Sequence, residues 1–182
     1  RGVYIMGENT VISDPNTNHA QAALEATDFI VVQDIFMTDT AKLADVVLPA
    51  ASFAESDGTF ANSERRVQRV RPAIKPVGEA RTDVDILLNV MSRFGVVQNL
   101  HTASDVWDEM RQLSPLFGGI TYDRLDVEGG IQWPCPTEDH PGTQYLHKDE
   151  MDSGMPGYFA PVDHIPPAEP ADSEYPLILT TG

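Results

Sequence analysis

This sequence of 182 residues contains almost no cysteine and no long apolar run. Cys135 is the only cysteine, so the chain can form no internal disulfide and cannot complete a cysteine-based metal site. The five histidines are scattered, and no two of them have the spacing of a zinc-binding pair. No apolar run approaches the roughly 20 residues needed to span a bilayer. We therefore expect no metal site and no membrane insertion.

Positive charge is also scarce, with 12 Lys and Arg against 28 Asp and Glu and a formal net charge of -16. A negative field of this size repels phosphate backbones and anionic membrane surfaces, so we expect no nucleic-acid partner. The simplest role of the acidity is solubility. The first residues, Arg1–Ile5, lack the basic and then apolar pattern of a signal peptide, and we expect a cytoplasmic location.

The usual fingerprints of NAD and ATP binding, GxGxxG and Walker A, are missing as well. What the chain does have is 41% hydrophobic residues, enough for the core of one ordinary domain. An apolar run starts at Val3, and a strand-like run at Pro176–Thr181 has nothing after it to pair with. We interpret both ends as internal boundaries of a longer protein.

Three short, uniformly apolar runs predict buried parallel strands. They are Val3–Met6, Phe29–Val32 and Asp45–Pro49, separated by a predicted helix at Asn16–Ala26 and a helical turn at Thr40–Ala44. This alternation is typical of a parallel sheet with crossover helices. We predict an α/β fold with a partial three-layer, Rossmann-like cofactor-binding domain.

Two amphipathic helices follow, at Thr82–Gly95 and Ser104–Leu113, the first with capping-box spacing between Thr82 and Asp85. Beyond Gln132 the chain becomes rich in proline, with nine of 14 prolines between Pro134 and Pro176. We divide the chain into a cofactor-binding domain (1–95), a helical extension (96–131), an irregular covering or linking segment (132–175) and the start of a further domain (176–182).

Polar residues follow two of the predicted strands, where ligands bind in open parallel sheets. Gly7, Glu8 and Asn9 follow the first strand, and Gln33 and Asp34 follow the second. Gly7 would let the backbone approach a ligand closely. Carboxylate and amide oxygens suit guanine, which presents adjacent N–H donors. The alternative is turn chemistry and helix capping.

Four arginines, Arg65, Arg66, Arg69 and Arg71, cluster in this acidic chain. They could neutralise cofactor phosphates, or they could form salt bridges at the surface or between domains. Cys135 has neither a basic neighbour nor a helix N-terminus in the sequence to activate it, so we interpret it as structural.

Six segments carry a resemblance that extends across almost the whole chain. The segments YIMGEN (4–9), VVQDIFMT (31–38) and ADVVLP (44–49) resemble the molybdopterin oxidoreductase family, and GTFANSERRVQR (58–69), GEARTD (78–83) and GIQWPC (130–135) are similar to its formate dehydrogenase branch. Several long motifs in the right order are more specific than one short pattern.

The resemblance implies a large subunit of four domains around a bis(molybdopterin guanine dinucleotide) centre with Mo or W and a 4Fe-4S cluster, served by electron-transfer subunits. This chain would be the second half of one cofactor-binding domain and the segment leading to a C-terminal β-barrel. The catalytic metal ligand would lie outside it, so the isolated chain should be inactive, without catalytic or metal-binding residues of its own.

The resemblance also places cofactor contacts on this sequence. They fall at Gly7, Glu8, Asn9, Ser13, Gln33, Asp34 and Asp83. The family often has an acid where Asn9 stands and Thr where Ser13 stands, and both replacements keep an acceptor. Nitrate reductase relatives have Lys at the position of Ser56, which puts a phosphate contact there in doubt.

Two alternatives remain open at this point. One is a nitrate reductase-like member of the same family, because the discriminating residues would lie outside this chain. The other is the pterin-free iron–sulfur large subunit of respiratory NADH dehydrogenase. The polar set Asn9, Gln33, Asp34 and Asp83 argues against the second alternative.

Overall fold

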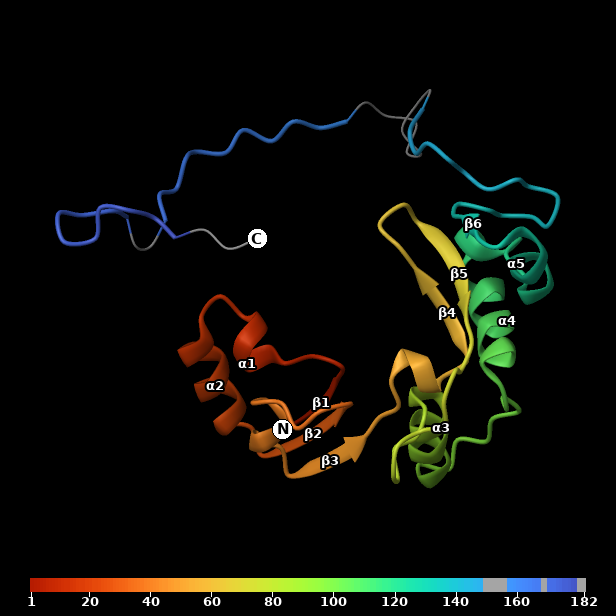
Figure 1. Cartoon of the computed structure of the whole chain (residues 1–182), viewed down its shortest axis with the longest axis horizontal. Coiled ribbons are helices and arrows are strands. Elements are labelled where there is room, and N and C mark those ends of the chain that lie inside the picture. Colours follow the sequence, from red (N-terminus) through yellow and green to blue (C-terminus); the bar gives the residue numbers. More distant parts are fainter. Residues whose placement is uncertain (149–156, 168–169, 180–182) are drawn as a thin grey trace. The chain divides into compact units, whose positions relative to one another are not determined.

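The computed structural model describes residues 1–148, 157–167 and 170–179 and divides the chain into two compact units, Arg1–Gln144 and Tyr145–Gly182. The helices and strands of the described residues all lie in the first unit (Figure 1). The strands are β1 (Gly2–Met6), β2 (Phe29–Asp34), β3 (Val46–Pro49), β4 (Gly58–Ala61), β5 (Arg66–Val70) and β6 (Ile131–Gln132). The α-helices are α1 (Thr10–Ser13), α2 (Thr17–Glu25), α3 (Asp83–Arg93), α4 (Ala103–Leu113) and α5 (Tyr122–Glu128). Short 3-10 helices are η1 (Ala41–Leu43), η2 (Phe53–Glu55) and η3 (Pro115–Phe117).

The first three strands form the predicted parallel sheet, in the order β1-β2-β3. One face of this sheet is covered by α1 and α2, which lie on the same side of it in Figure 1. A cluster of buried apolar side chains fills the space between them: Val11, Leu24, Ile30, Val32 and Ala41. The expected helix after the first strand and the helical turn before the third are both present.

The opposite face of the sheet is largely open, in contrast to the predicted three layers. Tyr4, Phe29 and Val46 share this face by register and are 39–49% exposed. Helix α3 lies near this face, and a cavity of about 490 Å³ lies between Leu48 on β3 and Ile86 on α3. Uniformly apolar strands predict a sheet that is covered on both faces. The described residues form a packed helical layer on one face of the sheet.

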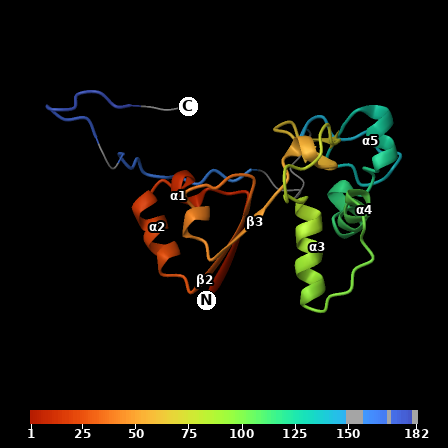
Figure 2. The ribbon, with the colours of Figure 1, turned by 60° about the horizontal axis from the view of Figure 1, so that its bottom comes forward.

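The second half of the first unit is an antiparallel sheet, in the order β4-β5-β6. The sequence analysis did not predict these strands. Helix α5 contacts β5, and α4 and α5 lie beside this hairpin in Figure 1. Figure 2 shows α3, α4 and α5 grouped together. A second buried cluster holds this half together: Val67, Ile120, Leu125, Ile131 and Cys135.

The clustered arginines make contacts within the chain. Arg65 donates to the carbonyl oxygens of Trp133, Thr143 and Gln144, which ties the β4–β5 hairpin to the segment after β6. Arg69 pairs with Asp57 at 2.9 Å and also approaches the carboxylate of Asp126. These contacts favour the salt-bridge interpretation of the cluster over phosphate binding.

Cys135 has the structural environment that the sequence predicted. Its side chain is fully buried in the second cluster, where Arg124 donates to the sulfur at 3.5 Å. The thiol approaches the carbonyl oxygen of His140 at 3.3 Å. A thiol enclosed in this way is out of reach of a substrate.

The proline-rich part of the chain is irregular wherever it is described. Residues 133–148, 157–167 and 170–179 contain no helix or strand. The boundaries proposed at 95, 131 and 175 stay predictions, as does the covering role, and Thr180–Gly182 lie outside the described residues. Among the residues that the structure describes, no helix is long and apolar enough to cross a membrane.

Candidate functional site

The carboxyl edge of the parallel sheet brings two of the predicted site residues into direct contact. Gln33 Nε2 donates to Asp83 Oδ1 at 2.5 Å, although 50 positions separate them in the sequence. Gln33 is the last residue but one of β2 and lies on the same face of the sheet as Tyr4, and Asp83 is the first residue of α3 after the Thr82 cap. Ala50 and Arg81 form a parallel bridge that brings the start of α3 to this edge.

Tyr4 completes this pair and was not predicted. Its hydroxyl donates to Gln33 Oε1, so the amide of Gln33 is used on both sides within the chain. Burial, followed by the nearby Asp83 carboxylate, raises the pKa of Tyr4. Gln33 has no exposed surface, and its amide contacts both Tyr4 and Asp83. A strand residue such as Tyr4 gives no sequence signal of this contact except its position three residues before Gly7, where the polar loop begins.

The loop after β1 folds around the remaining predicted residues. Gly7 has a φ of +63°, which favours glycine, and its N–H donates to the carbonyl of Gln33 at 2.9 Å. The Ser13 hydroxyl donates to Glu8, which closes the loop over α1. These contacts show turn chemistry at Glu8 and Ser13.

Asn9 and Thr40 form a second link at the same edge. Asn9 Oδ1 accepts from the Thr40 N–H at 3.1 Å and from its hydroxyl at 2.9 Å. Thr40 is fully buried and also accepts from the N–H of Val11. The sequence analysis missed Thr40 because it lies inside the expected helical turn and has no polar pattern around it.

Asp34 continues the edge beside Gln33. Its Oδ1 accepts from the N–H of Ile35 at 2.7 Å and more weakly from that of Phe36 at 3.4 Å. Its backbone carbonyl accepts from Ala50, which fixes the end of β2 against β3. The edge therefore presents two carboxylates, Asp34 and Asp83, held in place by neutral donors.

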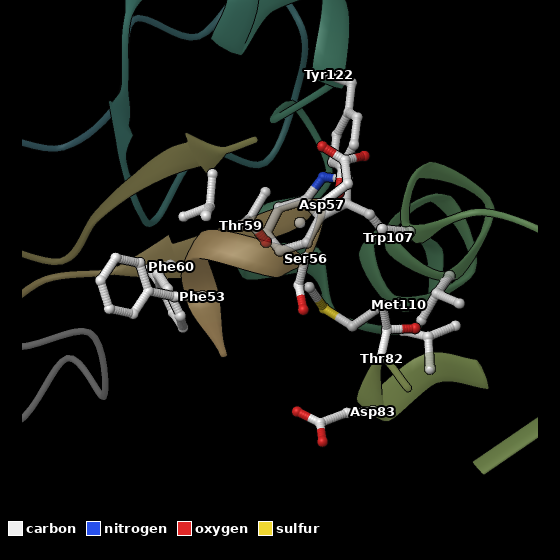
Figure 3. A pocket seen from close by; sticks show the side chains of 15 residues that line it. Phe53, Ser56, Asp57, Thr59, Phe60, Thr82, Asp83, Trp107, Met110 and Tyr122 are labelled. Carbon is white, nitrogen blue, oxygen red and sulfur yellow. The ribbon is translucent and has the colours of Figure 1, made fainter. Parts of the chain in front are cut away.

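A separate cavity of about 290 Å³ lies beside the β4–β5 hairpin and reaches Asp83 (Figure 3). Aromatic and apolar side chains dominate its lining, among them Phe53, Phe60, Trp107 and Tyr122. Burial raises the pKa of Tyr122. Asp83 thus borders both the sheet edge and this cavity.

The charged residues do not gather into a metal site. Within residues 1–148, 157–167 and 170–179, no group of three or more His, Cys, Asp or Glu side chains is placed to hold an ion. The sheet edge offers acceptors for a ligand that carries N–H donors.

The family model for molybdopterin oxidoreductases matches residues 1–93, which include the sheet, the polar edge and α3. The chain belongs to the molybdopterin oxidoreductase family. It is 50% identical to the F420-dependent formate dehydrogenase subunit alpha of Methanocaldococcus jannaschii over 184 residues, which cover 99% of this chain and 27% of that protein. It is 37% identical to formate dehydrogenase H of Escherichia coli, over all of this chain and 26% of that protein.

A solved structure of the same fold is acetylene hydratase from Pelobacter acetylenicus. It matches with a TM-score of 0.60 and 20% sequence identity, over 85% of this chain and 21% of that one. At this identity the match supports the family fold alone. The chain spans about a quarter of the length of the curated relatives it matches.

The family implies a molybdopterin cofactor, and the polar edge fits only part of such a group. Asp34 and Asp83 offer carboxylate oxygens to a donor-bearing base. Of the cationic side chains near these positions in the sequence, Lys42 pairs with Asp39 at 2.8 Å, and Arg81 lines the cavity beside Leu48 and Ile86. Two carboxylates at this edge suit the donor groups of a ligand better than they suit its anionic groups.

Proposed function

We propose that this chain is part of the alpha subunit of a formate dehydrogenase, and that its sheet edge binds the guanine end of a bis(molybdopterin guanine dinucleotide) cofactor. The observation that carries the proposal is the Gln33–Asp83 contact at the carboxyl edge of the parallel sheet. Support also comes from formate dehydrogenase relatives that are 37–50% identical over nearly the whole chain. When bound, the metal–pterin centre would supply the two-electron oxidation of formate to carbon dioxide.

The role proposed for this chain is to bind and orient the base. Asp83 would accept N–H donors of guanine, while Gln33 and Tyr4 hold its carboxylate in position. Asp34 would add a second acceptor, and the backbone turn at Gly7 would let the ligand approach the sheet. A base that presents an acceptor where guanine has N1–H would leave these carboxylates unmatched, so adenine should be rejected.

The proposal extends to the parts of the protein beyond these residues. Molybdenum or tungsten, the 4Fe-4S cluster and the metal ligand would be held elsewhere in the alpha subunit, and electrons would pass to partner subunits in the cytoplasm. The rest of the subunit would also supply the second covering layer of the sheet, completing the three-layer, Rossmann-like domain. The opening at Tyr4, Phe29 and Val46 supports this arrangement.

The test uses the full-length alpha subunit with Asp83→Ala or Gln33→Ala. Losing one matched buried hydrogen bond costs about 1–3 kcal/mol, which weakens base binding roughly fivefold to 150-fold. Pterin and metal content, measured by cofactor extraction and metal analysis, should fall, and formate oxidation should fall in proportion. Asp123→Ala, which removes a first-turn acid from α5, is the matched control and should keep full occupancy.

Full pterin and metal content combined with lost turnover in both variants would refute the proposed anchoring role. Loss of occupancy in the Asp123→Ala control as well would mean that the loss follows from general destabilisation.

A further inference from the structure

The aromatic cavity beside the β4–β5 hairpin is not accounted for by the proposed cofactor edge, with which it shares only Asp83. The lining residues come from η2, β4, β5, α3, α4 and α5 and from the loop between η2 and β4. Figure 3 shows Phe53, Phe60, Trp107 and Tyr122 among the side chains that surround it. Its volume of about 290 Å³ is large enough for an aromatic side chain.

Two aromatic side chains of the lining, Trp107 and Tyr122, are held in place by contacts within the chain. Trp107 Nε1 donates to the carbonyl of Ile120 at 2.6 Å, which fixes α4 against the segment before α5. The guanidinium of Arg69 lies 3.7 Å from the centre of the Tyr122 ring and pairs with Asp57. A cavity whose walls are already ordered loses little entropy when it is filled.

The rim of the cavity is apolar and open. Phe53 is 69% exposed and Phe60 is 59% exposed. Exposed aromatic rings beside an apolar lining are typical of an interaction site. They would become buried if an apolar group entered the cavity.

The charge of the lining residues determines which charge a ligand in the cavity can carry. Asp57 and Asp83 are the only charged residues that line it. Asp57 is neutralised by Arg69, whereas Asp83 contacts the neutral amide of Gln33 and leaves a negative charge at the edge of the cavity. An anion is therefore disfavoured, and a group with a cation next to its apolar part is favoured.

Polypeptide from outside this sequence would supply such a group. Beyond Lys148 the sequence contains no Lys or Arg, so its C-terminal residues lack the cation. The alpha subunits that this chain matches are about four times longer, because the match covers 27% of the Methanocaldococcus protein. We propose that the cavity is a docking site for a segment of the alpha subunit beyond these residues, one that inserts an aromatic side chain flanked by Arg or Lys.

The first test uses NMR of the 182-residue chain with two blocked dipeptides, N-acetyl-Phe-Arg-amide and N-acetyl-Phe-Glu-amide. The sequence has two tryptophans, so two indole N–H signals are expected, and Trp133→Phe assigns that of Trp107. The Phe-Arg peptide should shift the Trp107 signal saturably in the millimolar range, with about threefold tighter binding than the Phe-Glu peptide. No saturable shift, or tighter binding of the Phe-Glu peptide, would overturn the proposal.

Two variants test the location and the charge. Ala103→Leu adds bulk inside the cavity and should abolish the shift, while Ala23→Leu, the same change at an exposed site on α2, should leave it intact. Asp83→Asn should remove the preference for Phe-Arg and retain binding of both peptides. Equal binding by Ala103→Leu and the parent chain would place the peptide elsewhere and sink the idea, even if the cofactor proposal held.

Discussion

Gln33 is a polar side chain at a position where a parallel strand normally carries an apolar one. It is fully buried, and both ends of its amide are matched by Tyr4 and Asp83. An unmatched amide there would cost about 1–3 kcal/mol, so its partners are as necessary as the residue itself. The sequence indicated Gln33 by its place after a strand, and the family resemblance added Asp83 to the same site. It could not predict Tyr4, whose contact depends on which face of β1 it occupies.

Glu55 is a second buried polar residue, and its environment predicts a pH-dependent contribution to stability. It accepts from the N–H and hydroxyl of Ser52 and from the N–H of Val77, which joins η2 to the loop before α3. The backbone N–H of Ser52, followed by its hydroxyl, lowers the pKa of Glu55 below its ordinary value of 4.5. A lowered pKa means that stabilisation is present above this value and is lost as pH falls through the folded-state pKa.

Glu55→Gln should therefore lower the melting temperature at pH 7, because the amide cannot accept from all three donors. The difference from the parent chain should shrink as the pH falls below 4.5. Thermal unfolding followed by circular dichroism from pH 3 to 7 measures this difference in melting temperature. Glu109→Gln, at an exposed position, is the control. A difference that stays constant over this range would show that the charge of Glu55 is not the source.

At the level of elements, apolar runs predicted the parallel strands well and missed the hairpin. The β5 sequence Arg66–Val70 has two adjacent polar residues, Gln68 and Arg69, which break the alternation of a half-buried strand, and only Val67 is buried. Its arginines were interpreted only as charged groups, and five residues without strict alternation give a weak strand signal. The third strand, β6, has two residues and pairs with β5 across more than 60 positions, which no local pattern could reveal.

The segment before α5 packs too closely against the loop after β6 to accept a side chain at Gly119. An added Cβ would lie 1.9 Å from the carbonyl oxygen of Thr137, and the N–H of Gly119 donates to the carbonyl of Cys135 at 2.7 Å. Gly119→Ala should therefore force the two backbones apart and destabilise the chain by about 1–3 kcal/mol.

The single thiol provides a direct measure of this separation. Cys135 is fully buried in the parent chain, so it should react with Ellman's reagent only slowly. Gly119→Ala should react faster and unfold at lower denaturant concentration. Gly58→Ala is the control, because nothing lies within 4 Å of a Cβ placed there. Equal thiol reactivity in the two variants would contradict the predicted close packing.

The composition of the whole chain and the family resemblance make a prediction about metal content. One cysteine and scattered histidines provide no ligand cluster, and the resemblance places the metal ligand outside these residues. The purified 182-residue chain should contain no stoichiometric Mo, W, Fe or Zn and should not oxidise formate. Elemental analysis measures the first property and a dye-linked formate assay the second. A stoichiometric metal would show that the chain holds a site that its sequence does not indicate.

The division into two compact units makes a prediction about folding. The first unit, Arg1–Gln144, contains both buried clusters, and Arg65 donates to the carbonyls of Thr143 and Gln144 near its end. A chain that stops after Gln144 keeps these contacts. It should therefore unfold cooperatively at nearly the same temperature as the full chain.

Truncation at Gln144 also separates two roles for the proline-rich segment. If that segment only links domains, circular dichroism and calorimetry should give matching melts for the 1–144 and 1–182 chains. If it covers the core, as the sequence also suggested, truncation should expose apolar surface, lower the melting temperature and increase binding of a hydrophobic dye. A truncation before Thr143 serves as the control, since it removes the carbonyls that Arg65 binds and should destabilise the chain in either case.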